Sequence, residues 1–170
     1  MFKLVGAVCI VFATSSYGFQ KAKNFRNRTE ELRLFQDGLS MLQTEVTYGL
    51  TPLPEALRKI GKIVKAPVGD FFQEVFSKLM RGDGNLFTSY WDETLDSFPT
   101  ALNQEDKEII RNLGYSLGRS SVSEQKKHID ITLKQLYTAE RESKEQCAKN
   151  EKMWKYLGFF SGLALVLVLL

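Results

Sequence analysis

The chain has 170 residues, with 23 basic and 20 acidic side chains and a formal charge of +3. Three lysines lie outside residues 22–153, so that interior carries 20 side chains of each sign and no net charge, which argues against electrostatic nucleic-acid binding. Two cysteines and one histidine are too few for a disulfide framework or the usual zinc sites, and a reducing compartment is the simplest home for such a chain.

The first predicted element is an apolar segment from 4 to 19, which has no charged side chain and lies between Lys3 and Lys21. Its length is close to that of a bilayer core, so we predict an N-terminal transmembrane helix over residues 1–21. The alternative is a cleaved signal peptide, because small residues follow the short apolar run. Two features oppose cleavage. The run has no clear Ala-x-Ala site, and basic residues follow it, which favours a cytoplasmic location for the next segment: Lys21, Lys23, Arg26 and Arg28.

An amphipathic helix is predicted after this segment and reaches about Tyr48. Its apolar residues alternate steps of three and four, the spacing of one helical face: Leu32, Phe35, Leu39, Leu42, Val46 and Gly49. The stripe is short for a coiled-coil dimer, which is the alternative. We therefore expect it to form the core face of a helical bundle.

Gly49 and Leu50 are predicted to end this helix. Thr51 is expected to cap the next one, with Pro52 at its first helical position. The expected buried face of the second helix consists of Leu53, Ala56, Leu57, Ile60 and Val64.

A third helix is predicted from Pro67 to about Met80, followed by a turn over 81–85 whose two glycines are free to take positive φ. A fourth is predicted over 86–97, because Pro99 cannot continue it. The aromatic residues of this stretch, from Phe71 to Phe98, stand at helical spacing, so we interpret them as core; a ligand pocket is the alternative.

Asn103 is predicted to cap a fifth helix, which Gly118 ends. The acidic pairs Glu30-Glu31 and Glu105-Asp106 stand near helix starts, where the helix dipole explains them. Ser121 and Glu124 form a predicted capping box for a sixth helix. Its expected core face consists of Ile129, Thr132, Leu133, Leu136 and Tyr137.

Nothing breaks the sixth helix before the second apolar segment, in which Ser161 is the only polar side chain from 157 to 170. Trp154 and Tyr156 suit the headgroup level of a membrane. We therefore predict a C-terminal transmembrane helix over 154–170; a buried core helix is the alternative.

All four prolines fall at predicted helix boundaries, and no run alternates with a period of two. The expected fold is all-α: a six-helix bundle over residues 22–153, flanked by the two transmembrane helices. Because basic residues flank both apolar segments, we expect this domain in the cytoplasm and both termini on the far side of the membrane.

No catalytic, cofactor-binding or metal-binding residue is predicted. His128 stands two residues before Asp130 on an amphipathic helix, and we interpret it as a surface residue; a membrane-bound hydrolase using both is the alternative. Cys147 is not expected to be a reactive thiol. The chain has no P-loop motif, so it is not expected to bind nucleotide through one. We expect a protein that is not an enzyme and that works by contact.

Three motifs are specific when taken together: YGLTPLPEAL over 48–57, LGYSLG over 113–118 followed by QKKHI over 125–129, and KYLG over 155–158 with Gly162. In this order, between two terminal apolar segments, they resemble the stage III sporulation protein AB family of endospore-forming bacteria. That family is similar to the inner-membrane platform proteins of type II secretion and type IV pilus systems, whose cytoplasmic repeat is a six-helix bundle.

The resemblance to the platform proteins implies a structural motif at the helix corners, made of Gly49, Leu50, Ala56, Leu57, Gly114 and Gly118. The chain departs from the platform pattern at Tyr115, where an acid is common, and from the sporulation pattern at Ser121, where an aspartate is expected. It also has one such domain, whereas platform proteins have two. A homo-oligomer could supply the second.

The resemblance implies a platform or scaffold in a sporulation-specific, secretion-like channel complex between mother cell and forespore. The expected location is the mother-cell membrane that engulfs the forespore. The expected partners are a cytoplasmic secretion-type ATPase, the companion sporulation protein AA, and other membrane subunits of the channel. The alternative is an envelope-facing helical protein with a cleaved signal peptide and a C-terminal tail anchor.

Two short loops are the candidate contact sites for the ATPase, because they lie far along their helices from the predicted membrane ends. The candidate partner-binding residues are Gly49, Pro52, Glu55, Arg58, Arg81 and Asn85. The alternative is that these loops are only turns.

Overall fold

The computed structural model describes residues 26–117 and 122–169, with side chains described up to residue 149. These ranges contain six helices and no strand, as the periodicity predicts. The helices are residues 26–47, called the first helix below, α2 Leu53–Ile63, α3 Val68–Arg81, α4 Phe87–Ser97, α5 Gln104–Leu117 and α6 Val122–Leu169.

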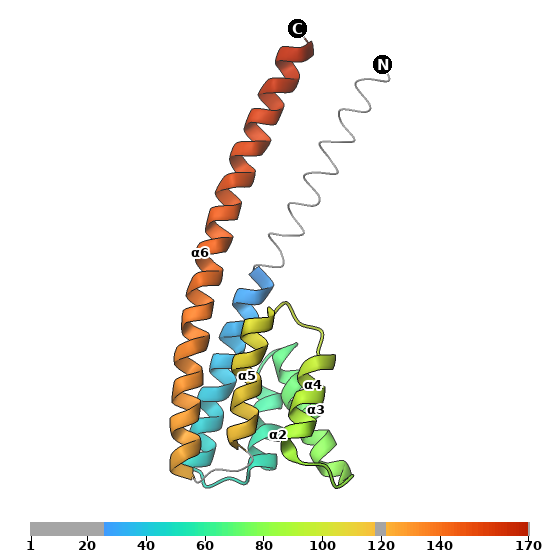
Figure 1. The fold of residues 1–170 in the computed structure, drawn as a ribbon, viewed down its shortest axis with the longest axis vertical. Helices are drawn as coiled ribbons and strands as arrows, with labels where there is room; N and C mark the ends of the chain where they lie inside the picture. Colours follow the sequence, from blue (N-terminus) through green and yellow to red (C-terminus); the bar gives the residue numbers. More distant parts are fainter. Residues whose placement is uncertain (1–25, 118–121, 170) are drawn as a thin grey trace.

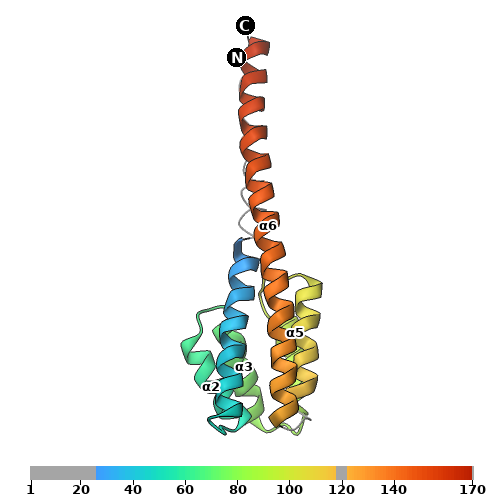
Figure 2. The same ribbon diagram turned by 90° about the vertical axis from the view of Figure 1, so that its left-hand side faces the viewer.

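Successive helices run in alternating directions, so the bundle has two distinct ends (Figure 1). Residue 26 lies at one end, and the C-terminal part of α6 extends far beyond the bundle from that same end (Figure 2). The connections 48–52 and 82–86 lie at the opposite end, where α6 also begins. We call that opposite end the distal end.

The core of the bundle is centred on aromatic rings. The Phe71 ring lies 5.5 Å from that of Phe35, 4.9 Å from that of Trp91 and 5.6 Å from that of Phe98, measured between centroids, in edge-to-face contacts that aromatic pairs favour. Phe71 and Trp91 have no exposed surface. The interpretation of these aromatics as core is therefore confirmed.

The apolar stripe of the first helix is buried as predicted: Leu32, Phe35, Leu39 and Leu42 have no exposed surface, and Val46 is 7% exposed. Gly49 was expected to extend this stripe, but the helix ends at residue 47 and Gly49 is exposed. The apolar spacing in the sequence therefore extends to a residue that lies beyond the end of the helix.

The corner between the first helix and α2 differs from the prediction. Thr51 does not cap α2, because its Oγ1 donates to Glu45 Oε2 at 2.6 Å, and Pro52 occupies the N-cap position without a side-chain cap. The positive φ of this corner belongs to Leu50, at 48°. The predicted positive φ values of Gly82 and Gly84 are confirmed, at 69° and 78°.

The buried face of α6 is narrower than predicted. Ile129, Thr132 and Leu136 are buried, whereas Tyr137, which was expected in the core, is 65% exposed. Adjacent positions on a helix point about 100° apart, so the residue after Leu136 turns away from the bundle. The buried face continues instead at Ala139.

α6 is one unbroken helix of 48 residues, which confirms the prediction that nothing interrupts it before the second apolar segment. Within residues 26–117 and 122–169, no helix is both long and apolar enough to cross a membrane. The predicted span over 1–21 lies outside the described residues, as do Gly118 and Ser121, and the side chains of 154–170 are not described. Both transmembrane helices therefore stay predictions.

Candidate functional site

A buried ion pair joins the start of the first helix to α5. Arg28 Nε lies 2.7 Å from Asp106 Oδ2, and Arg28 Nη2 lies 3.0 Å from Asp106 Oδ1, so the contact is bidentate. Asp106 is 1% exposed and Arg28 is 8% exposed. The hydrogen bond with Asp106 raises the pKa of Arg28 above its ordinary value. In the sequence Arg28 is one of the basic residues that follow the first apolar segment, and its burial against Asp106 was not predicted.

Asp106 also takes part in the N-terminal cap of α5. Its backbone N–H donates to Asn103 Oδ1 at 2.8 Å, and the Asn103 N–H donates back to Asp106 Oδ2 at 3.1 Å, which is a reciprocal capping box. The prediction that Asn103 caps α5 is therefore confirmed. The Asp106 carboxylate therefore both caps the N-terminus of α5 and pairs with Arg28 of the first helix.

A second acid of the first helix binds the connection between α4 and α5. Glu31 is 6% exposed and accepts a hydrogen bond from the Ala101 N–H at 3.0 Å and another from the Thr100 hydroxyl. The helix dipole was the expected explanation for Glu31 and Asp106, but their contacts lie between elements far apart in sequence. The sequence signal that could have identified the role of Asp106 is its position three residues after Asn103, the spacing of a capping box.

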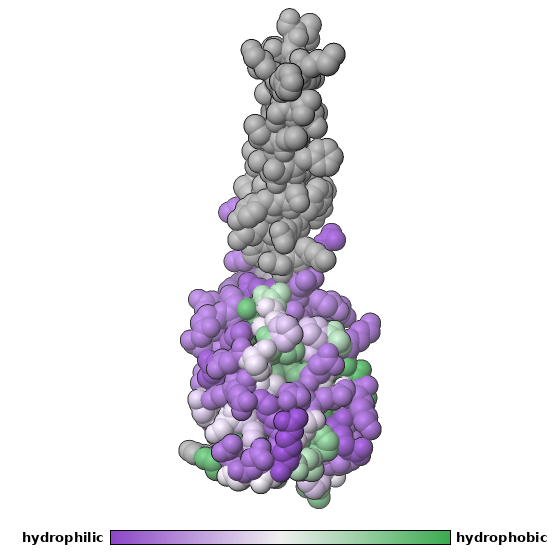
Figure 3. All heavy atoms as spheres, turned by 90° about the vertical axis from the view of Figure 1, so that its right-hand side faces the viewer, coloured by the Kyte–Doolittle hydropathy of each residue, from purple (hydrophilic) through white to green (hydrophobic). Residues whose placement is uncertain are grey.

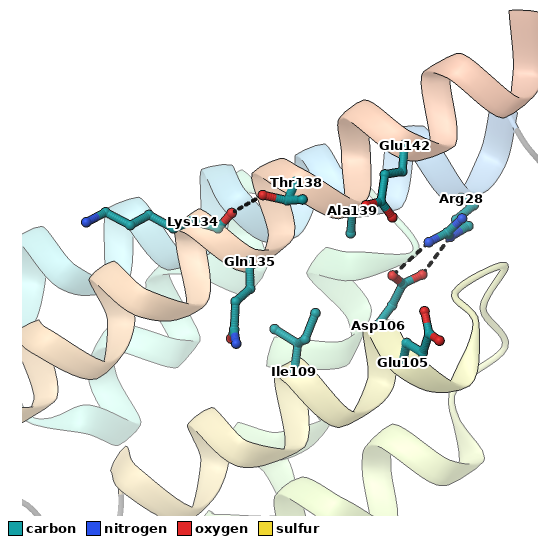
Figure 4. A pocket seen from close by; sticks show the side chains of 9 residues that line it. All are labelled: Arg28, Glu105, Asp106, Ile109, Lys134, Gln135, Thr138, Ala139 and Glu142. Atoms are coloured by element: carbon teal, nitrogen blue, oxygen red, sulfur yellow. Dashed lines mark hydrogen bonds and ion pairs between the residues drawn. The ribbon is translucent and has the colours of Figure 1, made fainter.

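A groove of about 370 Å³ lies between the first helix, α5 and α6, beside the ion pair (Figure 4). In Figure 4 the Arg28 and Asp106 side chains point toward one another at one end of it. Both are therefore already paired within the protein and are not offered to a ligand. The lining residues are Arg28, Glu105, Asp106, Ile109, Lys134, Gln135, Thr138, Ala139 and Glu142.

Three polar side chains of the first helix form hydrogen bonds with side chains of α6, and we call these three contacts the polar seam. Their members on the first helix are seven residues apart, so they share one face. The contacts are Thr29 Oγ1 to Ser143 Oγ at 2.8 Å, Gln36 Nε2 to Glu140 Oε2 at 3.0 Å, and Gln43 Nε2 to Asp130 Oδ1 at 2.6 Å. Hydrogen bonds need a particular geometry, so the seam specifies the register of these two antiparallel helices.

Glu140 is the buried carboxylate of the seam, whereas Asp130 is exposed. Burial raises the pKa of Glu140, but the hydrogen bonds from Lys144, at 2.6 Å, and from Gln36 outweigh burial, and the pKa lies below its ordinary value. A carboxylate whose pKa is lowered by folding contributes stability above its unfolded pKa and loses it as the pH falls through the folded value.

Glu140→Gln should therefore destabilise the chain most near neutral pH, and its difference from the wild type should shrink below about pH 4.3, where the unfolded carboxylate becomes protonated. Urea unfolding of both proteins in mild detergent, at several pH values, measures this difference. The other carboxylates are the same in both proteins, so their contributions to the difference in unfolding free energy cancel. A difference that stays constant from pH 7 to pH 3 would contradict the assigned role of the Glu140 charge.

Gly114 allows α4 to lie against α5. A Cβ at this position would lie 2.3 Å from Trp91 Cδ1, and Trp91 Nε1 donates to the Ile110 carbonyl at 3.0 Å. Of the other helix-corner residues, Ala56 and Leu57 are fully buried, Gly49 and Leu50 are exposed, and Gly118 lies outside the described residues.

Tyr115 stands where the platform proteins often carry an acid. Its hydroxyl donates to Asp92 Oδ2 on α4 at 2.8 Å, and this hydrogen bond raises the pKa of Tyr115 above its ordinary value. Where the platform proteins often have an acid, this chain therefore has a neutral hydroxyl that donates a hydrogen bond to Asp92 of α4.

The structure brings the candidate partner-binding residues to one end of the bundle. Gly49 and Pro52 are exposed on the first distal connection, and Arg81 and Asn85 are exposed at the second. The remaining two, Glu55 and Arg58, lie on α2 and form an ion pair with each other.

His128 is exposed on α6, and its proposed alternative partner Asp130 accepts the hydrogen bond from Gln43. Residues two apart on a helix do not face each other. Within residues 26–117 and 122–169, no group of three histidine, cysteine or acidic side chains is placed to hold a metal ion.

Comparison with known proteins gives a consistent result. A family model described as stage III sporulation protein AB matches residues 3–170. Stage III sporulation protein AB of Bacillus subtilis (strain 168) is 36% identical over 172 residues, and the match covers 100% of each chain. A solved structure of a stage III sporulation protein AB superposes with a TM-score of 0.67 and 26% identity, covering 72% of this chain and 97% of that one.

Proposed function

The chain belongs to the stage III sporulation protein AB family, and we propose that it is the membrane platform of a sporulation channel complex. In this proposal it couples a cytoplasmic secretion-type ATPase to other membrane subunits between mother cell and forespore. The chain acts as a scaffold and catalyses no reaction itself. It lies in the mother-cell membrane around the forespore, with the bundle in the cytoplasm and both termini on the far side.

One observation supports this proposal above all. The first helix begins and α6 leaves the bundle at the same end, and the connections with the candidate partner-binding residues lie at the other. If the two helices continue into a bilayer, the distal end points away from it. A soluble ATPase would then meet the distal end, while membrane subunits meet the anchors.

The contacts of the first helix support a platform that passes force. The polar seam joins it to α6, and the Arg28–Asp106 ion pair joins it to α5 within the first described turn. A displacement of the bundle would therefore reach both helices that lead toward the membrane.

The test uses membrane vesicles that contain the full chain. Purified companion ATPase, sporulation protein AA, is mixed with inverted and with right-side-out vesicles and sedimented. We expect the ATPase to sediment with inverted vesicles only, because only these expose the cytoplasmic face. Vesicles without the chain are the control.

Two outcomes would overturn parts of the proposal. Binding to right-side-out vesicles would place the bundle on the envelope side, as in the alternative with a cleaved signal peptide. Absence of binding to either kind of vesicle would remove the coupling to this ATPase.

A further inference from the structure

Exposed apolar side chains gather at the distal end. Nine large hydrophobic residues of the described part of the chain are exposed, and five of them lie on the two connections, in the last turn of α3 and at the start of α6. They are Tyr48 (75% exposed), Leu50 (77%), Met80 (58%), Leu86 (62%) and Val122 (45%), and we call them the distal surface. Figure 3 shows hydrophobic residues reaching the surface at the lower end of the bundle. Single exposed hydrophobic residues need no explanation, but five at one end of a bundle are more than scattered exposure.

Leu50 is unfavourable for the isolated chain in two ways. Its side chain is 77% exposed, and its φ of 48° is one that glycine or asparagine adopts at lower cost than leucine. Hydrogen bonds hold the corner in this conformation, including Thr51 N–H to the Glu45 carbonyl at 3.1 Å. A strained residue held in this way at a surface favours a functional reason for its side chain.

The charges around the distal surface are more often basic than acidic. Glu45 pairs with Lys59, and Glu55 pairs with Arg58, so these charges cancel. Arg81, Lys126 and Lys127 are exposed beside the distal surface, with Asp83 and Glu124 as the neighbouring acids. The Lys126 ammonium lies 5.9 Å from the centre of the Tyr48 ring, which brings a positive charge onto the apolar surface itself.

The position of the distal surface decides between possible occupants. Residue 26, where the described chain begins, lies at the opposite end from the distal surface. Two copies anchored in one membrane, as the proposed function has them, would stand side by side with their distal ends pointing the same way. They could not cover each other's distal surfaces. A soluble protein is the occupant that remains.

We propose that the distal surface is the docking site for the soluble ATPase, which meets it with an apolar patch bordered by carboxylates. This inference rests on the proposed function and adds the surface and the chemistry of the contact. Apolar side chains supply most of the affinity of such a contact, and the complementary charges mainly raise the association rate.

The test measures binding of purified companion ATPase to the full chain in lipid nanodiscs. Leu50→Asn removes the apolar side chain while suiting the positive φ, so the fold is kept. Met80→Gln removes a second apolar contact. We expect each variant to weaken binding by about tenfold, as loss of a central apolar contact does. Arg81→Glu should slow association, and more strongly at low salt.

Ile63→Asn and Tyr137→Ser are the matched controls, because these side chains are 64% and 65% exposed but lie away from the distal end. We expect their affinities to stay within twofold of the wild type. Circular dichroism of each variant checks that the helices are intact.

The outcomes separate the two proposals. A wild-type chain that fails to bind would overturn the proposed function itself. Wild-type binding that Leu50→Asn and Met80→Gln leave unchanged would overturn the distal surface alone. Equal loss in the controls would place docking elsewhere, and a change of oligomeric state in the distal variants would indicate contact between copies instead.

Discussion

Asp106→Ala is expected to lower the free energy of unfolding by about 3–5 kcal/mol, the usual loss when one partner of a buried ion pair is removed. The variant leaves the Arg28 guanidinium buried without its bidentate acceptor. It also removes the acceptor of the Asn103 N–H at the start of α5. Urea unfolding of the chain in mild detergent, followed by circular dichroism, measures the loss.

A double-mutant cycle separates the two contributions. Arg28→Met removes the cation but leaves the capping box, so it should cost less than Asp106→Ala, and the double variant should cost less than the sum of the two. Glu105→Ala, at an exposed position in the same turn, is the control and should change stability little. Strictly additive losses would show that the ion pair contributes no coupling.

Gly114→Ala is expected to destabilise the chain by about 2 kcal/mol. The new Cβ would lie 2.3 Å from Trp91 Cδ1, so the tryptophan or the helix must move. Overpacking of this kind costs about 1–3 kcal/mol and occasionally more, which the better helix propensity of alanine, worth about 1 kcal/mol, offsets only in part. The same unfolding measurement reports the effect.

The background variant Trp91→Leu tests the cause. If the ring is the obstacle, Gly114→Ala should cost much less in a chain that already has Trp91→Leu. Asn112→Ala, at an exposed position of the same helix, is the control and should be neutral or slightly stabilising. An equal cost of Gly114→Ala in both backgrounds would contradict the contact as its cause.

The helices and the core were predictable because their signals are local and periodic. The stripe from Leu32 to Val46 follows directly from helical spacing, and all of its members within the first helix are buried. Proline and glycine positions gave the breaks between helices. The prediction that Tyr137 lies in the core was wrong, because periodicity gives the direction of a helical face better than its width.

The candidate site was less predictable because its contacts join distant parts of the chain. Arg28 and Asp106 are 78 residues apart, and nothing beside either residue in the sequence indicates the other. Thr51 was assigned a capping role on its type alone, but the Glu45 carboxylate one turn before the corner accepts its hydroxyl instead. The positive φ of Leu50 had no sequence signal, since leucine rarely adopts it.

The polar seam also determines how the first helix and α6 can move against each other. Its residues on the first helix repeat every seven positions, Thr29, Gln36 and Gln43, which corresponds to about 10.5 Å along the axis. An axial slip of a few ångströms would break all three contacts at once, and a full repeat is needed before Gln36 stands opposite Ser143 and Gln43 opposite Glu140. Because no intermediate register restores these hydrogen bonds, the seam opposes sliding of the first helix along α6.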